Sequence, residues 1–217
     1  TRKAGKVKDK QRYKCRDCSY YYSVLSKSGS GNKTQKRQAL ELYLEGLGFR
    51  SIGRFLNFSH VTIHNWIKQY GKNLDLLQNS HEICLTEIDE MHSYIGSKKT
   101  PCWIWIAVDR YAKEFVNFTI GDRSTKTGKE LWKGVKDRAK GFIATDYWGP
   151  YKKFIPKDKH IQSKAHTYTV EGYNSLFRNF LARMRRKSKC YSKSKEMLEY
   201  SVKLLILKRN GMLDILN

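Results

Sequence analysis

The hydrophobic pattern of this chain changes its period once, near residue 81. Between Thr34 and Gly71 the apolar residues recur at the spacing of one face of an amphipathic helix. Beyond residue 81 they alternate with polar residues or form short continuous runs, which is typical of strands. A chain of 217 residues can bury one core of about 130 to 150 residues together with a smaller module. The pattern therefore predicts a small helical unit followed by a larger unit that contains a sheet.

The larger unit alternates between predicted strands and predicted helices. We expect strands at residues 83–95, 102–108, 115–120, 141–144 and 160–164. We expect helices at residues 124–140, 170–187 and 192–210. This order predicts an α/β fold with a mixed sheet and flanking helices.

The charge balance indicates a polyanionic partner. The chain has 43 Lys or Arg residues against 20 Asp or Glu residues, a net charge of +23. Nucleic acid is the obvious partner for such a surplus, and a solvated basic surface without a specific partner is the alternative. Residues 81–169 are the least basic, with 16 basic and 11 acidic side chains, which suits a region that holds metal ions with carboxylates.

Targeting signals and disulfides are not expected. No run of 18 apolar residues is present, and the first 20 residues lack the apolar core of a signal peptide. Five cysteines, an odd number, argue against a disulfide framework and indicate a reducing cytoplasm. Because the chain begins with Thr1 rather than Met, we expect it to be a fragment.

The helical unit fits a helix-turn-helix pattern. Three short helices are predicted between residues 34 and 71, with Ser59 as the N-cap of the third. In this interpretation the helix at about residues 60–70 enters the major groove of DNA. Its side chains that face bases or phosphates are Thr62, His64, Asn65 and Lys68. The alternative is an ordinary three-helix packing unit, and the basic surroundings favour DNA binding.

Metal-dependent cleavage of a phosphodiester needs oxygen ligands that converge from distant parts of the chain. Asp146 follows the predicted strand 141–144, at a strand end where sites in α/β folds collect. A plain turn-capping aspartate is the alternative for this residue. Asp109, at the end of strand 102–108, is a competing candidate for the same role.

A second candidate lies inside the first predicted strand. Asp89 belongs to the run Glu87-Ile88-Asp89-Glu90, and a carboxylate inside an apolar strand is costly unless it is paired or binds metal. Strand alternation places Glu87 and Asp89 on one face and Glu90 on the other. The period alone does not choose between the first two.

A third candidate begins the helix predicted at 170–187. Glu171, Asn174 and Arg178 share one face of this helix. The carboxylate of Glu171 is suited to metal, and Arg178 to a phosphate. The alternative is that the helix dipole simply favours a glutamate in the first turn.

These residues resemble the transposases of the insertion sequence one family. The blocks that carry the resemblance run in the same order over about residues 10–205. They are Glu87-Ile88-Asp89-Glu90, Gly121-Asp122-Arg123-Ser124, Thr145-Asp146 with Trp148 and Tyr151, the set Thr167, Val170, Glu171, Asn174 and Arg178, then Leu181-Ala182-Arg183, Arg186-Lys187-Ser188 and Ser192-Lys193-Ser194.

The resemblance implies a ribonuclease-H-like catalytic domain with Asp89, Asp146 and Glu171 as its metal ligands. Two Mg²⁺ ions, or Mn²⁺, are then expected to support strand cleavage and strand transfer. The expected partner is double-stranded DNA, both the element ends and the target, contacted by Arg178, Arg183, Arg186 and Lys187. A homo-oligomer on DNA is expected by analogy, in a prokaryotic cytoplasm and associated with the nucleoid.

The sequence departs from the family pattern in two places. Tyr147 stands where a glycine is usual after the second aspartate. The family's zinc ribbon has two Cys-x-x-Cys pairs, whereas only Cys15 and Cys18 are present, so zinc is expected only if a preceding pair exists. The remaining thiols, of Cys84, Cys102 and Cys190, are interpreted as core or bystander residues.

The predicted division has three parts: residues 1–32 as a basic tail with half of a zinc-ribbon motif and a linker, 33–78 as a helix-turn-helix DNA-binding domain, and 79–217 as the catalytic domain. Two other functions stay open. One is a non-catalytic regulator or remnant that binds the terminal repeats. The other is a structure-selective nuclease on the same fold, which would not need residues 34–72.

Overall fold

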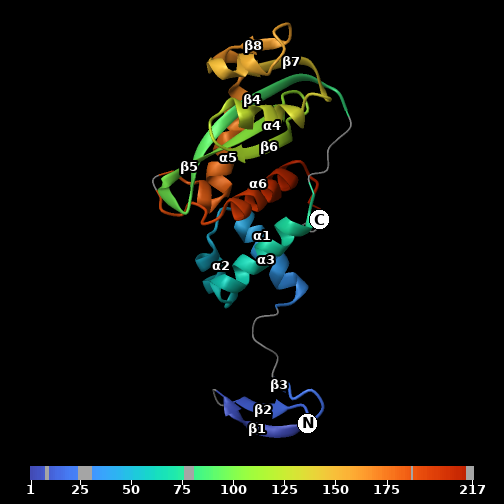
Figure 1. The fold of residues 1–217 in the computed structure, drawn as a ribbon, viewed down its shortest axis with the longest axis vertical. Coiled ribbons are helices and arrows are strands. Elements are labelled where there is room, and N and C mark those ends of the chain that lie inside the picture. Colours follow the sequence, from blue (N-terminus) through green and yellow to red (C-terminus); the bar gives the residue numbers. More distant parts are fainter. Residues whose placement is uncertain (8–9, 24–30, 76–80, 187, 214–217) are drawn as a thin grey trace.

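The computed structural model describes residues 1–7, 10–23, 31–75, 81–186 and 188–213. Its first element is a small antiparallel sheet of order β1-β2-β3, formed by Arg2–Val7, Lys10–Lys14 and Tyr21–Tyr22 (Figure 1). The sequence predicted a basic tail with half of a zinc-ribbon motif here, without naming strands. The aromatic run explains the difference, because Tyr22 stacks on Tyr13 with ring centroids 5.9 Å apart and Arg12 lies 4.1 Å over the ring of Tyr21. The linker predicted at residues 26–32 lies mostly outside the described residues.

Three helices follow, α1 (Lys33–Leu44), α2 (Phe49–Leu56) and α3 (His60–Asn73). Asn32 begins α1 with a capping box to Gln35. The predicted N-cap of α3 is confirmed, since the hydroxyl of Ser59 accepts the backbone N–H of Thr62 at 3.0 Å. Asn57, with φ 58°, ends α2 in the left-handed conformation that reverses the chain into α3.

The remainder contains the mixed sheet that the sequence predicted. Its strand order is β6-β5-β4-β7-β8, in which β6, β5 and β4 are antiparallel and β4, β7 and β8 are parallel. The strands are β4 (Ile83–Ile95), β5 (Ser97–Asp109), β6 (Glu114–Gly121), β7 (Ala139–Thr145) and β8 (His160–Gln162).

The helices that flank the sheet are α4 (Thr125–Lys133), α5 (Tyr168–Phe180) and α6 (Lys195–Arg209), with short 3-10 helices at Gly149–Lys153, Lys164–His166 and Ala182–Met184. Two predicted helices were too long. The one at 124–140 ends at Lys133, where Gly134 caps it and β7 follows. The one at 170–187 ends at Phe180, because Leu181 is extended and the chain turns to bury Arg183 and Met184.

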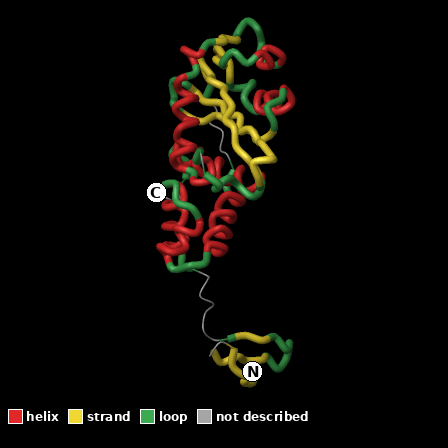
Figure 2. Tube along the Cα trace, turned by 90° about the vertical axis from the view of Figure 1, so that its left-hand side faces the viewer, coloured by secondary structure: helices red, strands yellow, loops and turns green. Residues whose placement is uncertain are grey.

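Two hydrophobic cores lie on opposite faces of the sheet. One face of β4 and β5 packs with α5, α6 and all three helices α1 to α3 in a single core. The other face packs under α4 and the Gly149–Lys153 turn. Figure 2 shows helices on both sides of the strands. The helical segment α1–α3 therefore shares its core with the sheet instead of folding around one of its own. Among the described helices, none combines the length and the apolar character needed to cross a membrane.

Candidate active site

Strand register places Asp146 beside Asp89. In the parallel pairing of β4 with β7, Glu87 lies opposite Ala144. Two residues further along both strands, Asp89 and Asp146 are at the same level, and adjacent strands are about 4.8 Å apart. Asp146 comes directly after the end of β7, where its Oδ1 accepts the backbone N–H of Trp148 at 2.9 Å.

The acidic residues of β4 differ in their partners. Glu87 is fully buried, and its Oε1 is 2.5 Å from Nε of Arg110. Glu90, on the opposite face, pairs with Arg123 at 2.7 Å and accepts a hydrogen bond from the hydroxyl of Tyr151. Asp89 has no cationic partner among the described ion pairs. The partners therefore distinguish the two residues that strand periodicity left open: Glu87 forms an ion pair with Arg110, whereas Asp89 forms none among the described residues.

Helix α5 is held across β4 at two points. The backbone N–H of Val170 donates to Oε2 of Glu87 at 2.8 Å, and Nδ2 of Asn174 donates to Oδ2 of Asp89 at 2.6 Å. Glu171 lies between these anchors in the first turn, and its side chain is exposed. Oδ1 of Asn174 is buried and has no hydrogen-bond partner. An oxygen acceptor thus stays open next to Asp89.

The electrostatic environment of Asp89 shows that the three candidate carboxylates interact. The pKa of Asp89 is raised to about 7, chiefly by burial and also by the neighbouring charges of Glu90, Asp146 and Glu171, against a backbone hydrogen bond that lowers it. A largely buried carboxylate with other acidic side chains nearby favours a bound cation. Within the described ranges, no three His, Cys, Asp or Glu side chains are yet grouped closely enough to hold a metal ion.

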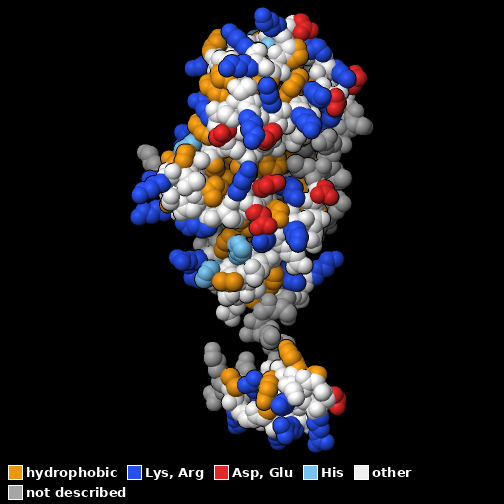
Figure 3. Space-filling view, viewed as in Figure 1, with side chains coloured by type: hydrophobic (Ala, Val, Ile, Leu, Met, Phe, Trp, Pro, Cys, Tyr) orange, Lys and Arg blue, Asp and Glu red, His pale blue; other side chains and the backbone are white. Residues whose placement is uncertain are grey.

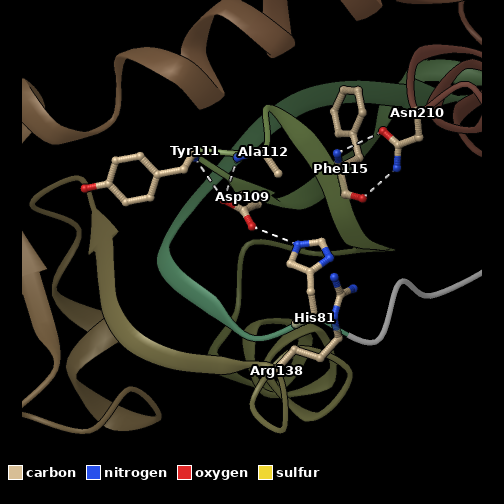
Figure 4. A network of polar contacts seen from close by, with 7 residues as sticks. All are labelled: His81, Asp109, Tyr111, Ala112, Phe115, Arg138 and Asn210. Carbon is tan, nitrogen blue, oxygen red and sulfur yellow. Dashed lines mark hydrogen bonds and ion pairs between the residues drawn. The ribbon is translucent and has the colours of Figure 1, made fainter.

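Both carboxylate oxygens of Asp109, the competing candidate, have partners at the end of β5 (Figure 4). Its Oδ1 accepts the backbone N–H groups of Tyr111 and Ala112 at 2.9 and 3.1 Å, and its Oδ2 lies 3.1 Å from Nε2 of His81. The residue is only 4% exposed. This carboxylate therefore holds the connection between β5 and β6.

The basic side chains expected to contact DNA fall into different environments. Burial, followed by the charge of the nearby Arg186, lowers the pKa of Arg178, and the charge of Asp89 raises it. Arg183 was expected at a DNA surface, but it is buried: its Nε donates to the hydroxyl of Tyr43 at 2.7 Å and its Nη1 to Ser192 at 2.8 Å. Arg183 thereby links α1 to the segment before α6. Arg186 is exposed, and Lys187 lies outside the described residues.

The four predicted contact residues of α3 also differ in availability. Asn65 is exposed, whereas the hydroxyl of Thr62 is 2.8 Å from that of Ser59 in the helix cap. The ring of His64 stands edge-on to Phe49 at 5.3 Å. Lys68 forms an ion pair of 2.8 Å with Glu196 of α6. Lys68 is thus held against α6, whereas Asn65 in the first half of α3 is open.

Cys15 and Cys18 lie in the turn between β2 and β3. Hydrogen bonds from the backbone of Cys18 and of Asp17, then from the Cys18 side chain, lower the pKa of the Cys15 thiol. The two thiols thus lie close together. No third metal-binding side chain joins them within the described part of the chain. Of the other cysteines, Cys102 is buried, and Cys84 and Cys190 are exposed.

Sequence reasoning missed the residues that arrange the site. Arg110, Arg123 and Tyr151 reach the β4 carboxylates across 20 or more positions of the sequence, and nothing local connects them. For Arg110 one signal was available: it directly follows the strand that pairs with β4. Asn174 was placed on the face of Glu171, but its hydrogen bond to Asp89 was not foreseen.

Two family models match parts of the chain. The model described as IS1 transposase matches residues 82–210, and a model described as a gpP-like ATPase subunit of terminase matches residues 34–78. The first match contains Asp89, Asp146 and Glu171. The second covers the helical segment alone.

Individual relatives agree with the first match. The insertion element iso-IS1n protein InsB of Shigella dysenteriae is 34% identical over 115 residues, which cover 53% of this chain and 88% of that protein. The insertion element IS1 4 protein InsB of Escherichia coli K12 is 34% identical over 118 residues, 54% of this chain and 71% of that protein. A solved structure of a simian T-cell lymphotropic virus intasome in complex with PP2A regulatory subunit B56 gamma has a TM-score of 0.41 at 13% identity, covering 76% of this chain and 66% of that chain. This last likeness is too weak to carry an argument.

Proposed function

This chain belongs to the IS1 transposase family, and from this premise we propose that it is a DDE transposase that cuts and rejoins DNA with Asp89, Asp146 and Glu171. The observation that carries the proposal is the parallel register that puts Asp146 level with Asp89, while neither carboxylate takes part in an ion pair among the described residues. Helix α5 adds Glu171 between its two anchors on β4.

We propose that the sheet with its helices is a ribonuclease-H-like catalytic domain. Three antiparallel strands followed by two parallel ones, with the candidate acids on the central strand β4 and at the end of β7, support this assignment. Residues 33–78 act in this proposal as a helix-turn-helix DNA-binding domain, and residues 1–32 as a separate basic region. The exposed first half of α3 supports the DNA-binding role.

The donor set at the site fits divalent metal. Asp89, Asp146 and Glu171 offer the hard oxygens that Mg²⁺ and Mn²⁺ prefer, and the open Oδ1 of Asn174 supplies a further acceptor. These residues would hold two ions. Bound there, the ions would activate a water or a 3′-hydroxyl for attack on a phosphodiester and stabilise the charge that develops.

The chain's own residues have separate tasks in this proposal. The hydrogen bond from Asn174 orients Asp89, and the Glu87–Arg110 pair fixes the start of α5 and thereby Glu171. A pKa of about 7 means that both protonation states of Asp89 are populated near neutral pH, so a cation held there would compete with a proton. Arg178 lies within electrostatic range of Asp89 and would steady a phosphate of the DNA strand. Because two DNA ends must be joined, we propose that the active form is a homo-oligomer.

The test is strand transfer by the full chain on DNA with the ends of its own element. With Mg²⁺ or Mn²⁺ the wild-type protein should cut these ends and join them to a target duplex, and it should do neither in EDTA. Glu171→Gln should lower cleavage by about a thousandfold, since it removes an exposed metal ligand worth several kcal/mol in the transition state. Its matched control is Glu130→Gln, an equally exposed glutamate on α4, which should cut normally.

Two outcomes decide between the functions. Normal cleavage by Glu171→Gln would refute the assignment. Cutting without joining, and without preference for the element ends, would instead indicate a structure-selective nuclease. Deleting residues 34–72 cannot make this distinction, because α1–α3 share a core with the sheet and the deletion would expose that core.

A further inference from the structure

A basic groove lies beside the candidate carboxylates, between the hairpin of β4 and β5 and the segment before α6. It is a pocket of about 360 Å³, in which five of the eleven lining residues are Lys or Arg and none is acidic. We define the basic groove by Lys98, Arg178, Arg185, Arg186, Tyr94 and Tyr191. In Figure 3, Lys and Arg side chains gather at the left-hand projection, where Figure 1 places this hairpin.

The segment before α6, which lines one side of the groove, pairs with β4 beyond the end of β7. Beyond Asp89, β7 no longer pairs with β4. The segment before α6 pairs with this part of β4 instead, through a parallel bridge between Ile95 and Ser192 and a hydrogen bond of 2.8 Å from the N–H of Gly96 to the carbonyl of Ser192. The buried side chain of Arg183 fixes this segment by donating a hydrogen bond to the hydroxyl of Ser192. The groove is thus a built feature of the fold.

None of the lining residues of the groove is acidic, and Asp89, outside the lining, is the acidic residue whose charge acts on Arg178. Arg178 and Arg186 repel one another, and among the described residues neither they nor Lys98 and Arg185 take part in an ion pair. Like charges held together without counter-charges favour an anionic ligand. Phosphates along one strand of a nucleic acid match a row of such cations.

The row of cations joins the carboxylates to the helical segment. At one end, Asp89 and Arg178 interact electrostatically. At the other end, the guanidinium of Arg185 lies so close to Gly46, between α1 and α2, that a Cβ there would come within 2.8 Å of it. A strand that runs along the groove therefore leads from the helices to the proposed site of cleavage.

Aromatic rings accompany the cations. Tyr94 and Tyr191 approach one another with ring centroids 5.9 Å apart, the ring of His92 is 4.6 Å from that of Tyr94, and Lys193 lies 4.6 Å over Tyr191. Aromatic side chains stack on bases only when these are unpaired, because the faces of a base inside a duplex are already covered by its neighbours. The aromatic rings thus distinguish a single strand from a duplex.

We propose that the basic groove binds unpaired nucleotides next to the phosphate that is cut, so that the DNA end is opened as it enters the site. This inference rests on the proposed function for the position of the cut. The cations hold the backbone of one strand, and Tyr94 and Tyr191 stack on its bases. The protein would then bind frayed or mismatched ends better than fully paired ones.

The test compares a twelve-nucleotide single strand with the corresponding duplex in fluorescence anisotropy, with Ca²⁺ in place of Mg²⁺. Tyr191→Ala and Tyr94→Ala should each weaken single-strand binding by roughly tenfold and change duplex binding by less than about twofold. Tyr191→Phe should restore single-strand affinity because it keeps the ring. Arg186→Gln should reduce the salt dependence of single-strand binding by about 0.7 in the log–log slope.

The matched control is Tyr111→Ala. Tyr111 is 71% exposed and lies past the far end of β5, a strand of 13 residues and so roughly 40 Å long. It should leave both affinities unchanged. Equal losses for Tyr111→Ala and Tyr191→Ala, or equal losses on both DNA forms, would overturn the proposal.

These measurements need no cleavage, so they are independent of the catalytic assignment. If the protein cuts its element ends but the tyrosine substitutions do not change single-strand binding, the proposed function is supported and the proposed role of the basic groove is refuted. If the protein binds single strands through Tyr191 but never cuts DNA, the proposed function is refuted and the proposed role of the basic groove is supported.

Discussion

Asp109 is the last residue of β5 and Asp146 directly follows β7, two strands that lie on either side of β4, and the two carboxylates have different surroundings. Asp109 is buried and has three hydrogen-bond partners. Asp146 is partly exposed, and one of its carboxylate oxygens has no partner among the described hydrogen bonds. Both stand where a strand gives way to a turn, and sequence alone makes both eligible.

Strand direction separates the two residues. Asp109 is opposite Thr86 in the antiparallel pairing of β4 with β5, and cross-strand partners point to the same face. Because Thr86 alternates with Glu87, Asp109 faces away from Asp89. The parallel pairing of β4 with β7 brings Asp146 level with Asp89 instead. A carboxylate with its partners complete holds a turn, whereas one left open beside other acids is available to a cation.

The largest expected difference between the two aspartates comes from replacing each of them, in separate variants, with asparagine. Asp146→Asn should lower DNA cleavage by about a thousandfold, or roughly 4 kcal/mol in the transition state, because it removes a metal ligand. Binding to the element ends should stay within about twofold. Cleavage is measured by gel under single-turnover conditions, and binding by anisotropy in Ca²⁺.

Asp109→Asn is the control. The amide keeps an oxygen for the N–H groups of Tyr111 and Ala112 and loses only the charge that faces His81, so unfolding should become easier by about 0.5–1 kcal/mol. Cleavage below the melting temperature should be normal. Similar losses of cleavage in both variants would show that the two strand ends do not differ in function.

A middle-sized effect concerns Asp89, whose pKa is raised to about 7 from an unfolded value near 3.8. Between these values the folded protein binds more protons than the unfolded chain, so the stability contributed by this group is present at low pH and lost as the pH rises through about 7. Asp89→Asn removes the dependence. In EDTA the variant should be more stable than wild type by about 1–2 kcal/mol at pH 8, less than the full shift because the carboxyl is partly exposed, and nearly equal at pH 4.

Urea unfolding at pH 4, 6 and 8 measures the difference. Added Mg²⁺ should stabilise the wild-type protein at pH 8 and have a smaller effect on Asp89→Asn, because bound metal supplies the missing counter-charge. A stability difference that does not change with pH would mean that Asp89 is not the group with the raised pKa.

How far the sequence predicts this molecule depends on how local each feature is. The bounds of β4 and the N-cap of α3 follow from periodicity and from one capping residue, and both were correct. The distinction between Glu87 and Asp89 depends on Arg110, more than twenty positions away, and so required the strand pairing. The early end of α5 depends on the burial of Arg183 against Tyr43 of the helical segment, which no local pattern contains.

The smallest expected effect applies the same distinction between occupied and open side chains to α3. Lys68 is neutralised by Glu196 of α6, whereas Asn65 is exposed and its amide nitrogen has no partner among the described hydrogen bonds. Asn65→Ala should weaken binding to the element ends by about 1 kcal/mol, or fivefold, at the low end for a lost base contact. Lys68→Ala should change affinity by less than about twofold and leave the salt dependence intact, because its charge is already compensated. If Lys68→Ala instead weakens binding more than Asn65→Ala, the ion pair must open on DNA, and α3 would then contact the duplex along its whole length and not through its first half alone.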